Sequence, residues 1–102
     1  MTDRFDNVWD AIENTPEQAE NMRLRSRLMM ALEDRIQQAG MTQQEAARVL
    51  GVTQPRVSDL MRGKIDLFGL DMLVNMAVAA GLHINLTIDQ NAASPVLETR
   101  EG

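Results

Sequence analysis

The side chains best suited to specific hydrogen bonding lie at positions 54–58, where the sequence is QPRVS. A glutamine amide can donate and accept hydrogen bonds at the edge of adenine, and the arginine fork matches guanine in the same way. A serine hydroxyl can bond to either edge. We therefore predict that Gln54, Arg56 and Ser58 contact DNA bases; the alternative is that they are solvated surface residues.

A second set of side chains is suited to phosphates. Gln43 and Gln44 open the preceding predicted helix, where they can donate to a phosphate together with the helix amides. Arg48, Arg62 and Lys64 would add an attraction that does not depend on base sequence, with a solvated surface position again the alternative. The chain has a net charge of −5, yet positions 23–64 hold eight basic against four acidic residues. A local basic surface therefore lies in the middle of an acidic chain.

Two short helices are predicted to position these side chains. Thr42 and Glu45 form a capping-box pattern at the start of the first helix, and Thr53 caps the second. Ala47 is small enough for the second helix to pass close by, and Gly51 permits the left-handed backbone of a tight turn. Val57 and Leu60 would fill the space beneath. Residues 43–62 thus predict a helix-turn-helix.

The elements on either side complete an all-α prediction. Thr15 and Pro16 open a long helix that Gly40 ends, and a last helix runs over residues 70–80. Period-two alternation over residues 83–88 predicts a strand. We divide the chain into an acidic amphipathic segment (1–15), a DNA-binding domain with the C-terminal strand (16–88) and a flexible tail (89–102).

The stretches from Val8 to Leu32 and from Met41 to Leu82 resemble the Xre/Cro-like helix-turn-helix regulators, particularly the short antitoxin-type members related to HigA. The resemblance implies a lambda-repressor-like bundle of about five helices and an autoregulating repressor of a type II toxin-antitoxin pair. Its partners would be a double-stranded DNA operator and a RelE/HigB-like toxin. Gln43 would match the family's phosphate- and base-proximal glutamine. Gly69 departs from the pattern, since this group often has Ser as that N-cap.

Assembly and partner binding are predicted from two apolar sets. The strand would expose unpaired backbone edges, so we expect two copies to form a homodimer by pairing their strands through Ile84, Leu86 and Ile88. The alternative is an irregular segment packed on its own domain. An apolar helical face edged by acidic residues is predicted near the N-terminus and consists of Phe5, Val8, Trp9 and Ile12. This face would bind a basic partner; the alternative is that Trp9 packs on the chain's own domain.

Other classes of function are not favoured. His83 is the single histidine, and the acidic residues lack metal-ligand spacing, so we expect no enzyme, metal site or cofactor. There is no cysteine and no apolar run long enough to span a membrane, which leads us to expect a cytoplasmic protein. The alternatives to an antitoxin are a stand-alone Xre-type regulator and a protein-interaction module that inhibits a basic partner.

Overall fold

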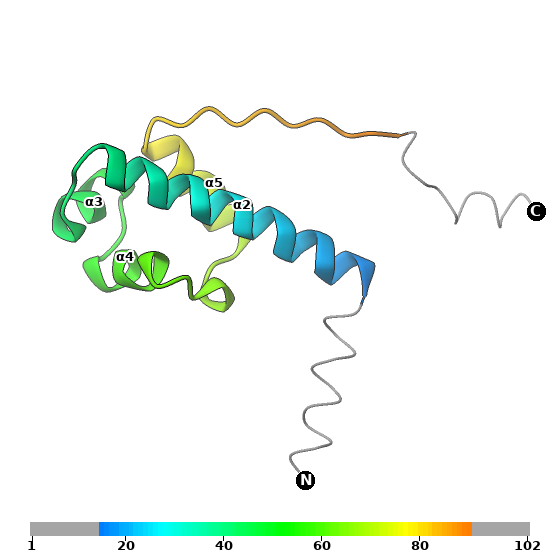
Figure 1. The fold of residues 1–102 in the computed structure, drawn as a ribbon, viewed down its shortest axis with the longest axis horizontal. Helices are drawn as coiled ribbons and strands as arrows, with labels where there is room; N and C mark the ends of the chain where they lie inside the picture. The colour runs from blue at the N-terminus through cyan, green and yellow to red at the C-terminus, as the bar shows by residue number, and fades with distance from the viewer. Residues whose placement is uncertain (1–14, 91–102) are drawn as a thin grey trace, which may run out of the picture.

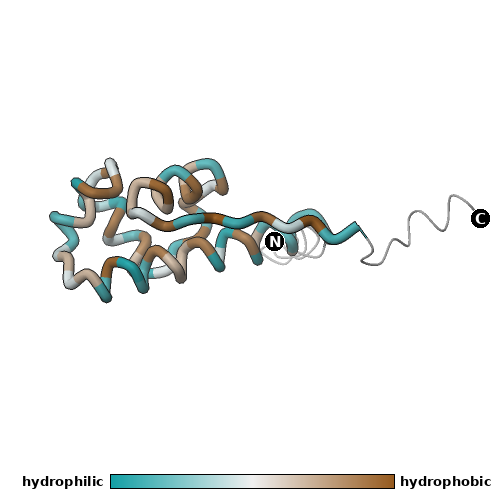
Figure 2. Tube along the Cα trace, turned by 90° about the horizontal axis from the view of Figure 1, so that it is seen from above, coloured by the Kyte–Doolittle hydropathy of each residue, from teal (hydrophilic) through white to brown (hydrophobic). Residues whose placement is uncertain are grey.

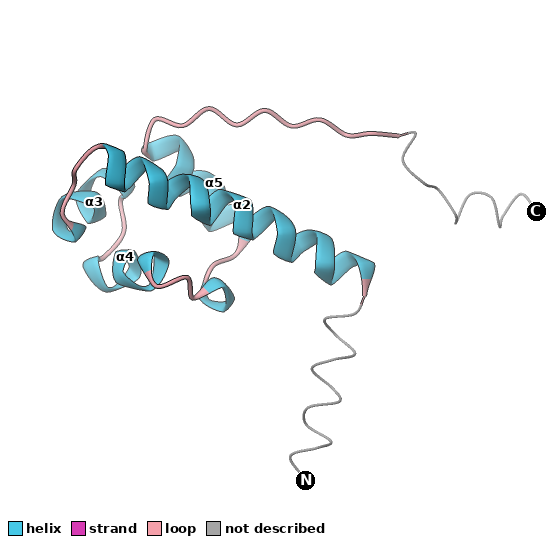
Figure 3. Cartoon of the chain, viewed as in Figure 1, coloured by secondary structure: helices cyan, strands magenta, loops and turns pink. Residues whose placement is uncertain are grey.

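The structure is a computed structural model that describes residues 15–90. Within these residues it contains four α-helices, one short 3₁₀ turn and no strand (Figures 1 and 3). Four of the about five expected helices are therefore observed. The remaining one, a short amphipathic helix that the apolar spacing of Phe5, Val8, Trp9 and Ile12 predicts at residues 6–13, lies outside the described residues. The elements are α2 (Pro16–Gln38), α3 (Gln43–Leu50), α4 (Gln54–Met61), η1 (Ile65–Leu67) and α5 (Leu70–Ala79).

Threonine side chains begin three of the four helices. The hydroxyl of Thr15 accepts from the amide of Gln18 at 3.1 Å, and Thr53 accepts from Arg56 at 3.3 Å. Thr42 and Glu45 bond to each other's backbone amides in a full capping box. Because each cap satisfies an amide that has no partner within its own helix, the starts of α2, α3 and α4 are fixed by local sequence.

An apolar core joins the helices. The long helix α2 packs against α5 and η1, while α3 packs against α4 and α5. No polar or charged side chain is buried among the described residues, so burial of apolar surface is what holds the helices together. The largest fully buried side chains are Phe68, Leu32, Leu60, Leu73, Met76 and Val57.

The segment after α5 differs from its prediction. Residues 82–89 form neither helix nor strand, although the segment alternates between apolar and polar residues (Figures 2 and 3). A strand requires a neighbour to receive its backbone hydrogen bonds, and the described residues supply none. The expected strand at residues 83–88 is therefore absent from the single chain, which carries an extended segment in its place.

Arg35 holds the start of this extended segment in place. Its Nε donates to the carbonyl of Ala80 at 2.9 Å and so connects α2 to the end of α5. Gly81 has a φ of +84°, and a Cβ placed there would lie 2.9 Å from Arg35 Nη2. The chain thus leaves α5 past the Arg35 guanidinium through a backbone conformation that glycine adopts easily.

No helix in the described part is long and apolar enough to cross a membrane.

Candidate nucleic-acid interface

The unit formed by α3 and α4 is built around a tight turn. Gly51 adopts the left-handed conformation, with φ 71° and ψ 33°. The next amide, of Val52, donates to the Ala47 carbonyl at 3.0 Å, which closes the C-terminal end of α3. Ala47 is buried, as are Val57 and Leu60 on α4. Small and apolar residues therefore occupy the contact between the two helices, and the polar residues are left outside it.

The first turn of α4 presents side chains in two different directions. Gln54 is exposed and Ser58 half-buried. Because successive residues of a helix are rotated by about 100°, Gln54 and Ser58 lie within about 40° of each other. Arg62 continues the same row four residues later. Arg56 is turned by about 200° from Gln54, so it lies on the opposite flank of the helix.

Arg56 already has partners in the DNA-free protein. Its Nη1 donates to the carbonyl of Leu67 at 3.2 Å. Its guanidinium also lies 5.4 Å from the centroid of the Phe68 ring, within the range of a cation–π interaction. The structure therefore brings Gln54 and Ser58 together and directs Arg56 toward η1. That Arg56 contacts a base stays a prediction, and such contact would require these two interactions to be exchanged.

The predicted phosphate contacts differ in their freedom. Gln43, Gln44 and Arg48 on α3 are exposed, and Gln44 and Arg48 share one face through their spacing of four residues. Arg62 is also exposed. Lys64 Nζ lies 3.9 Å from Asp59 Oδ1, so its charge is partly offset by a carboxylate of α4. Lys64 is thus the one predicted phosphate contact that has an ion-pair partner among the described residues.

Arg25 is a positioning residue that our sequence reasoning missed. Its Nη1 donates to the carbonyls of Ile65 at 3.1 Å and Phe68 at 3.4 Å. Arg25 from α2 and Arg56 from α4 together bond to three carbonyls of the connection between α4 and α5. A sequence signal does exist, because Arg25 precedes the buried Met29 and Leu32 by four and seven residues and so continues the apolar face of α2.

The residues predicted for assembly and partner binding are placed only in part. Ile84, Leu86 and Ile88 are 39%, 78% and 73% exposed, so the single chain leaves them largely uncovered. Phe5, Val8, Trp9 and Ile12 lie outside the described residues.

Comparisons with known proteins agree with this geometry. A family model described as a helix-turn-helix domain matches residues 11–89, a range that includes the four described helices and the extended segment. Among solved structures, the chain is similar to one described as an XRE family transcriptional regulator, with 32% sequence identity and a TM-score of 0.68. That match covers 74% of this chain and 85% of the other. No curated protein matches the chain.

Proposed function

The chain belongs to the XRE family of helix-turn-helix proteins, and from this premise we propose that it is a sequence-specific DNA-binding transcriptional repressor. The observation that carries the proposal is that Gln54 and Ser58 share one side of α4, while Val57 and Leu60 hold the helix against the core. When a helix-turn-helix binds DNA, the N-terminal end of its second helix, which is α4 here, enters the major groove. Gln54 and Ser58 contact base edges directly, and Arg56 joins them after leaving Leu67 and Phe68.

The residues around α4 complete the proposed interface. Gln43 and Gln44 at the start of α3 donate to a phosphate together with free helix amides. Arg48, Arg62 and Lys64 attract the backbone of any duplex. Contacts of this second kind set register and orientation, while the α4 side chains supply the sequence preference.

Selection of bound sequences from random duplex DNA with the purified full chain tests the repressor proposal. We expect one enriched sequence, with Gln54→Ala relaxing the preference at one position of each half-site. Gln37→Ala, which changes an exposed glutamine on α2, is the matched control and leaves the preference unchanged. No enrichment over unselected DNA would contradict sequence-specific binding.

We further propose that the protein binds its operator as a homodimer. Ile84, Leu86 and Ile88 are exposed on a segment that pairs with no strand within residues 15–90, and this exposure supports antiparallel pairing with a second copy. Such a two-fold arrangement would present two α4 helices to major grooves about 34 Å apart, so the selected DNA would be symmetric.

Sedimentation at micromolar concentration tests the dimer. The wild-type chain is expected to be dimeric and Leu86→Asp monomeric, because the substitution places a charge in the pairing surface. Met30→Asp changes an exposed apolar residue on α2 and should remain dimeric. A monomeric wild-type chain would refute the pairing and favour the alternative, in which residues 83–88 pack on their own domain.

The narrowest form of the proposal is an autoregulating antitoxin. The acidic and apolar N-terminal segment supports a basic toxin as the protein partner, with the DNA-binding domain repressing the shared operon. A neighbouring gene for a small basic toxin, whose product co-purifies with this chain, would support the role. A stand-alone XRE regulator would have no such neighbour, and in that case the antitoxin proposal is withdrawn while the DNA-binding proposal stands.

A further inference from the structure

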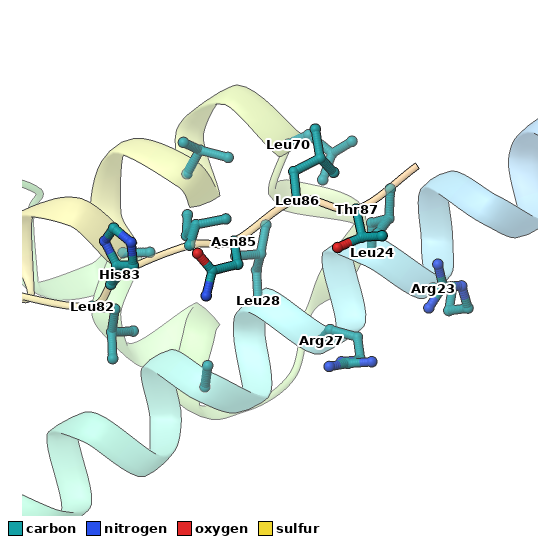
Figure 4. Close-up of a pocket in the computed structure, with 14 residues that line it drawn as sticks. Arg23, Leu24, Arg27, Leu28, Leu70, Leu82, His83, Asn85, Leu86 and Thr87 are labelled. Atoms are coloured by element: carbon teal, nitrogen blue, oxygen red, sulfur yellow. The ribbon is translucent and has the colours of Figure 1, made fainter. Parts of the chain in front are cut away.

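An apolar groove lies on the side of the molecule formed by α2, α5 and the extended segment. It has a volume of 540 Å³ and is lined on its third side by residues 82–87 (Figure 4). A second hollow beside Ala19 and Met22 is also lined by Arg23, so concave surface continues toward the start of α2. The lining residues that matter here are Leu24, Leu28, Val74 and Ala77, with Arg23 and Arg27 on α2.

The charged side chains that line this groove are all positive. No acidic residue lines it, while Arg23 and Arg27 both do. Arg23 is bonded to Glu20 at 2.6 Å, with both side chains more than half exposed. Arg27 has neither a hydrogen bond nor an ion pair to another side chain within residues 15–90, which leaves its guanidinium open to an incoming carboxylate. The groove therefore suits an apolar segment that carries negative charge.

We propose that the N-terminal segment of this same chain, residues 5–12, occupies the groove. The segment has Phe5, Val8, Trp9 and Ile12 at helical spacing, and its acids Asp6 and Asp10 complement Arg23 and Arg27. A helix of this length is not stable alone in water, so it gains order only by covering its apolar face. This inference is independent of DNA binding, since the groove contains no residue of α3 or α4.

The chain is long enough to make this connection. Along α2, groove residues extend from Arg23 to Ala31, about 10 to 22 Å from Pro16 at about 1.5 Å per residue. The link from Ile12 to Pro16 can span about 14 Å when extended, and residues 5–12 as a helix cover about 10 Å more. A segment folded back along α2 therefore reaches the far end of the groove. In this position its apolar face is covered, and an external partner must first displace it.

Trp9 provides a direct readout because it is the single tryptophan of the chain. The experiment measures Trp9 emission and acrylamide quenching in the full-length protein and in a free peptide of residues 1–15. Two groove variants are Arg27→Glu, which reverses the charge, and Val74→Ser, which weakens the apolar wall. Their matched controls are Arg48→Glu and Val49→Ser on α3, where the side chains are exposed and outside the groove. Far-UV circular dichroism checks that each variant is folded.

We expect Trp9 in the full chain to emit at shorter wavelength than the peptide and to be quenched severalfold less. Both groove variants should move the signal toward the peptide, and both controls should keep the wild-type signal. A Trp9 as accessible as in the peptide overturns the proposal. So does a shielded Trp9 that ignores both groove variants, or shielding that disappears on dilution to a monomer, which would assign the groove to a second copy.

Discussion

Replacing Arg56 with Ala removes two interactions whose sizes can be compared. The hydrogen bond to the Leu67 carbonyl contributes about 0.5–1.5 kcal/mol, and the cation–π contact with Phe68 contributes about 0.5–1 kcal/mol at an exposed site. We therefore expect Arg56→Ala to lower the free energy of unfolding by about 1–2.5 kcal/mol. In a domain of this size that loss lowers Tm by at least about 4 °C.

The same substitution should weaken operator binding less than the removal of an arginine that has no partners in the DNA-free protein. A bidentate contact with guanine discriminates by about 1–3 kcal/mol, but Arg56 must first give up interactions worth about 1–2.5 kcal/mol. Taking the middle of each range, the net loss of operator affinity should be below about 1 kcal/mol, or less than about fivefold. Thermal unfolding and fluorescence anisotropy, with selected and scrambled duplexes, measure both effects.

The control for Arg56→Ala is Arg48→Ala, which deletes an exposed arginine of α3. Arg48 has no side-chain hydrogen bond within the described residues, so its loss should change stability by less than about 0.5 kcal/mol. An Arg56→Ala protein as stable as wild type would refute the contacts with η1. An unchanged ratio of affinities for the selected and scrambled duplexes would show that Arg56 is not a base contact, even if stability falls as expected.

Three further predictions concern other parts of the molecule. Lys64→Ala should lower the affinity for selected and scrambled duplexes to a similar degree in the anisotropy assay, because a phosphate contact carries no base preference. A loss of affinity for the selected duplex alone would contradict this role. Gly51→Ala should lower the free energy of unfolding by about 1 kcal/mol, since a Cβ there meets no atom within 4 Å but forces a left-handed residue. Gly51→Asn should cost less, because Asn adopts that conformation more readily, and equal losses would argue against backbone strain. Burial and the neighbouring Asp34 raise the pKa of Glu33, so the folded state binds its proton more tightly and this carboxylate costs stability at neutral pH. Glu33→Gln should therefore raise Tm at pH 7. The gain should fade as pH falls through the raised pKa of Glu33 and be absent below the ordinary carboxyl pKa of about 4.3, so a gain that persists in acid would have another cause.

The helix boundaries were predictable because their determinants are local. Thr42 with Glu45, Thr53 with Pro55, and the left-handed Gly51 act within a few residues of the chain, so sequence spacing alone indicates where α3 and α4 begin and where the turn lies. The apolar spacing within each helix likewise follows from its period. These features account for the agreement between the predicted helix-turn-helix and the observed one.

The departures from prediction depend on contacts between distant segments. Arg25 and Arg56 bond to carbonyls 40 and 11 residues away, and no local pattern specifies which carbonyl lies within reach. Sequence reasoning placed Arg56 with Gln54 because both open one helix, whereas the position of η1 beside α4 directs it elsewhere. The segment at residues 82–89 is not a strand in the structure for a related reason, because residues 15–90 contain no second strand with which it could pair.

The arginine–carbonyl bonds also limit how strongly salt should affect DNA binding. Each phosphate neutralised by a cation releases counterions and contributes about −0.9 to the slope of log affinity against log salt concentration. All eight basic residues at positions 23–64 would give a slope of about −7 per chain. Five of them are already bonded to carbonyls or carboxylates, namely Arg23, Arg25, Arg35, Arg56 and Lys64.

Among the described residues, Arg27 lines the groove beside α5 and not the DNA-facing surface, so Arg48 and Arg62 are the unbonded cations near α3 and α4. Two phosphate contacts correspond to a slope of about −2 per chain, or about −3 if Lys64 leaves Asp59 to bind a third phosphate. A protein with so shallow a salt dependence holds random DNA weakly and dissociates from it readily. If the chain binds DNA as the proposed homodimer, its discrimination between operator and genome must therefore come from the bases that α4 contacts in each of two half-sites.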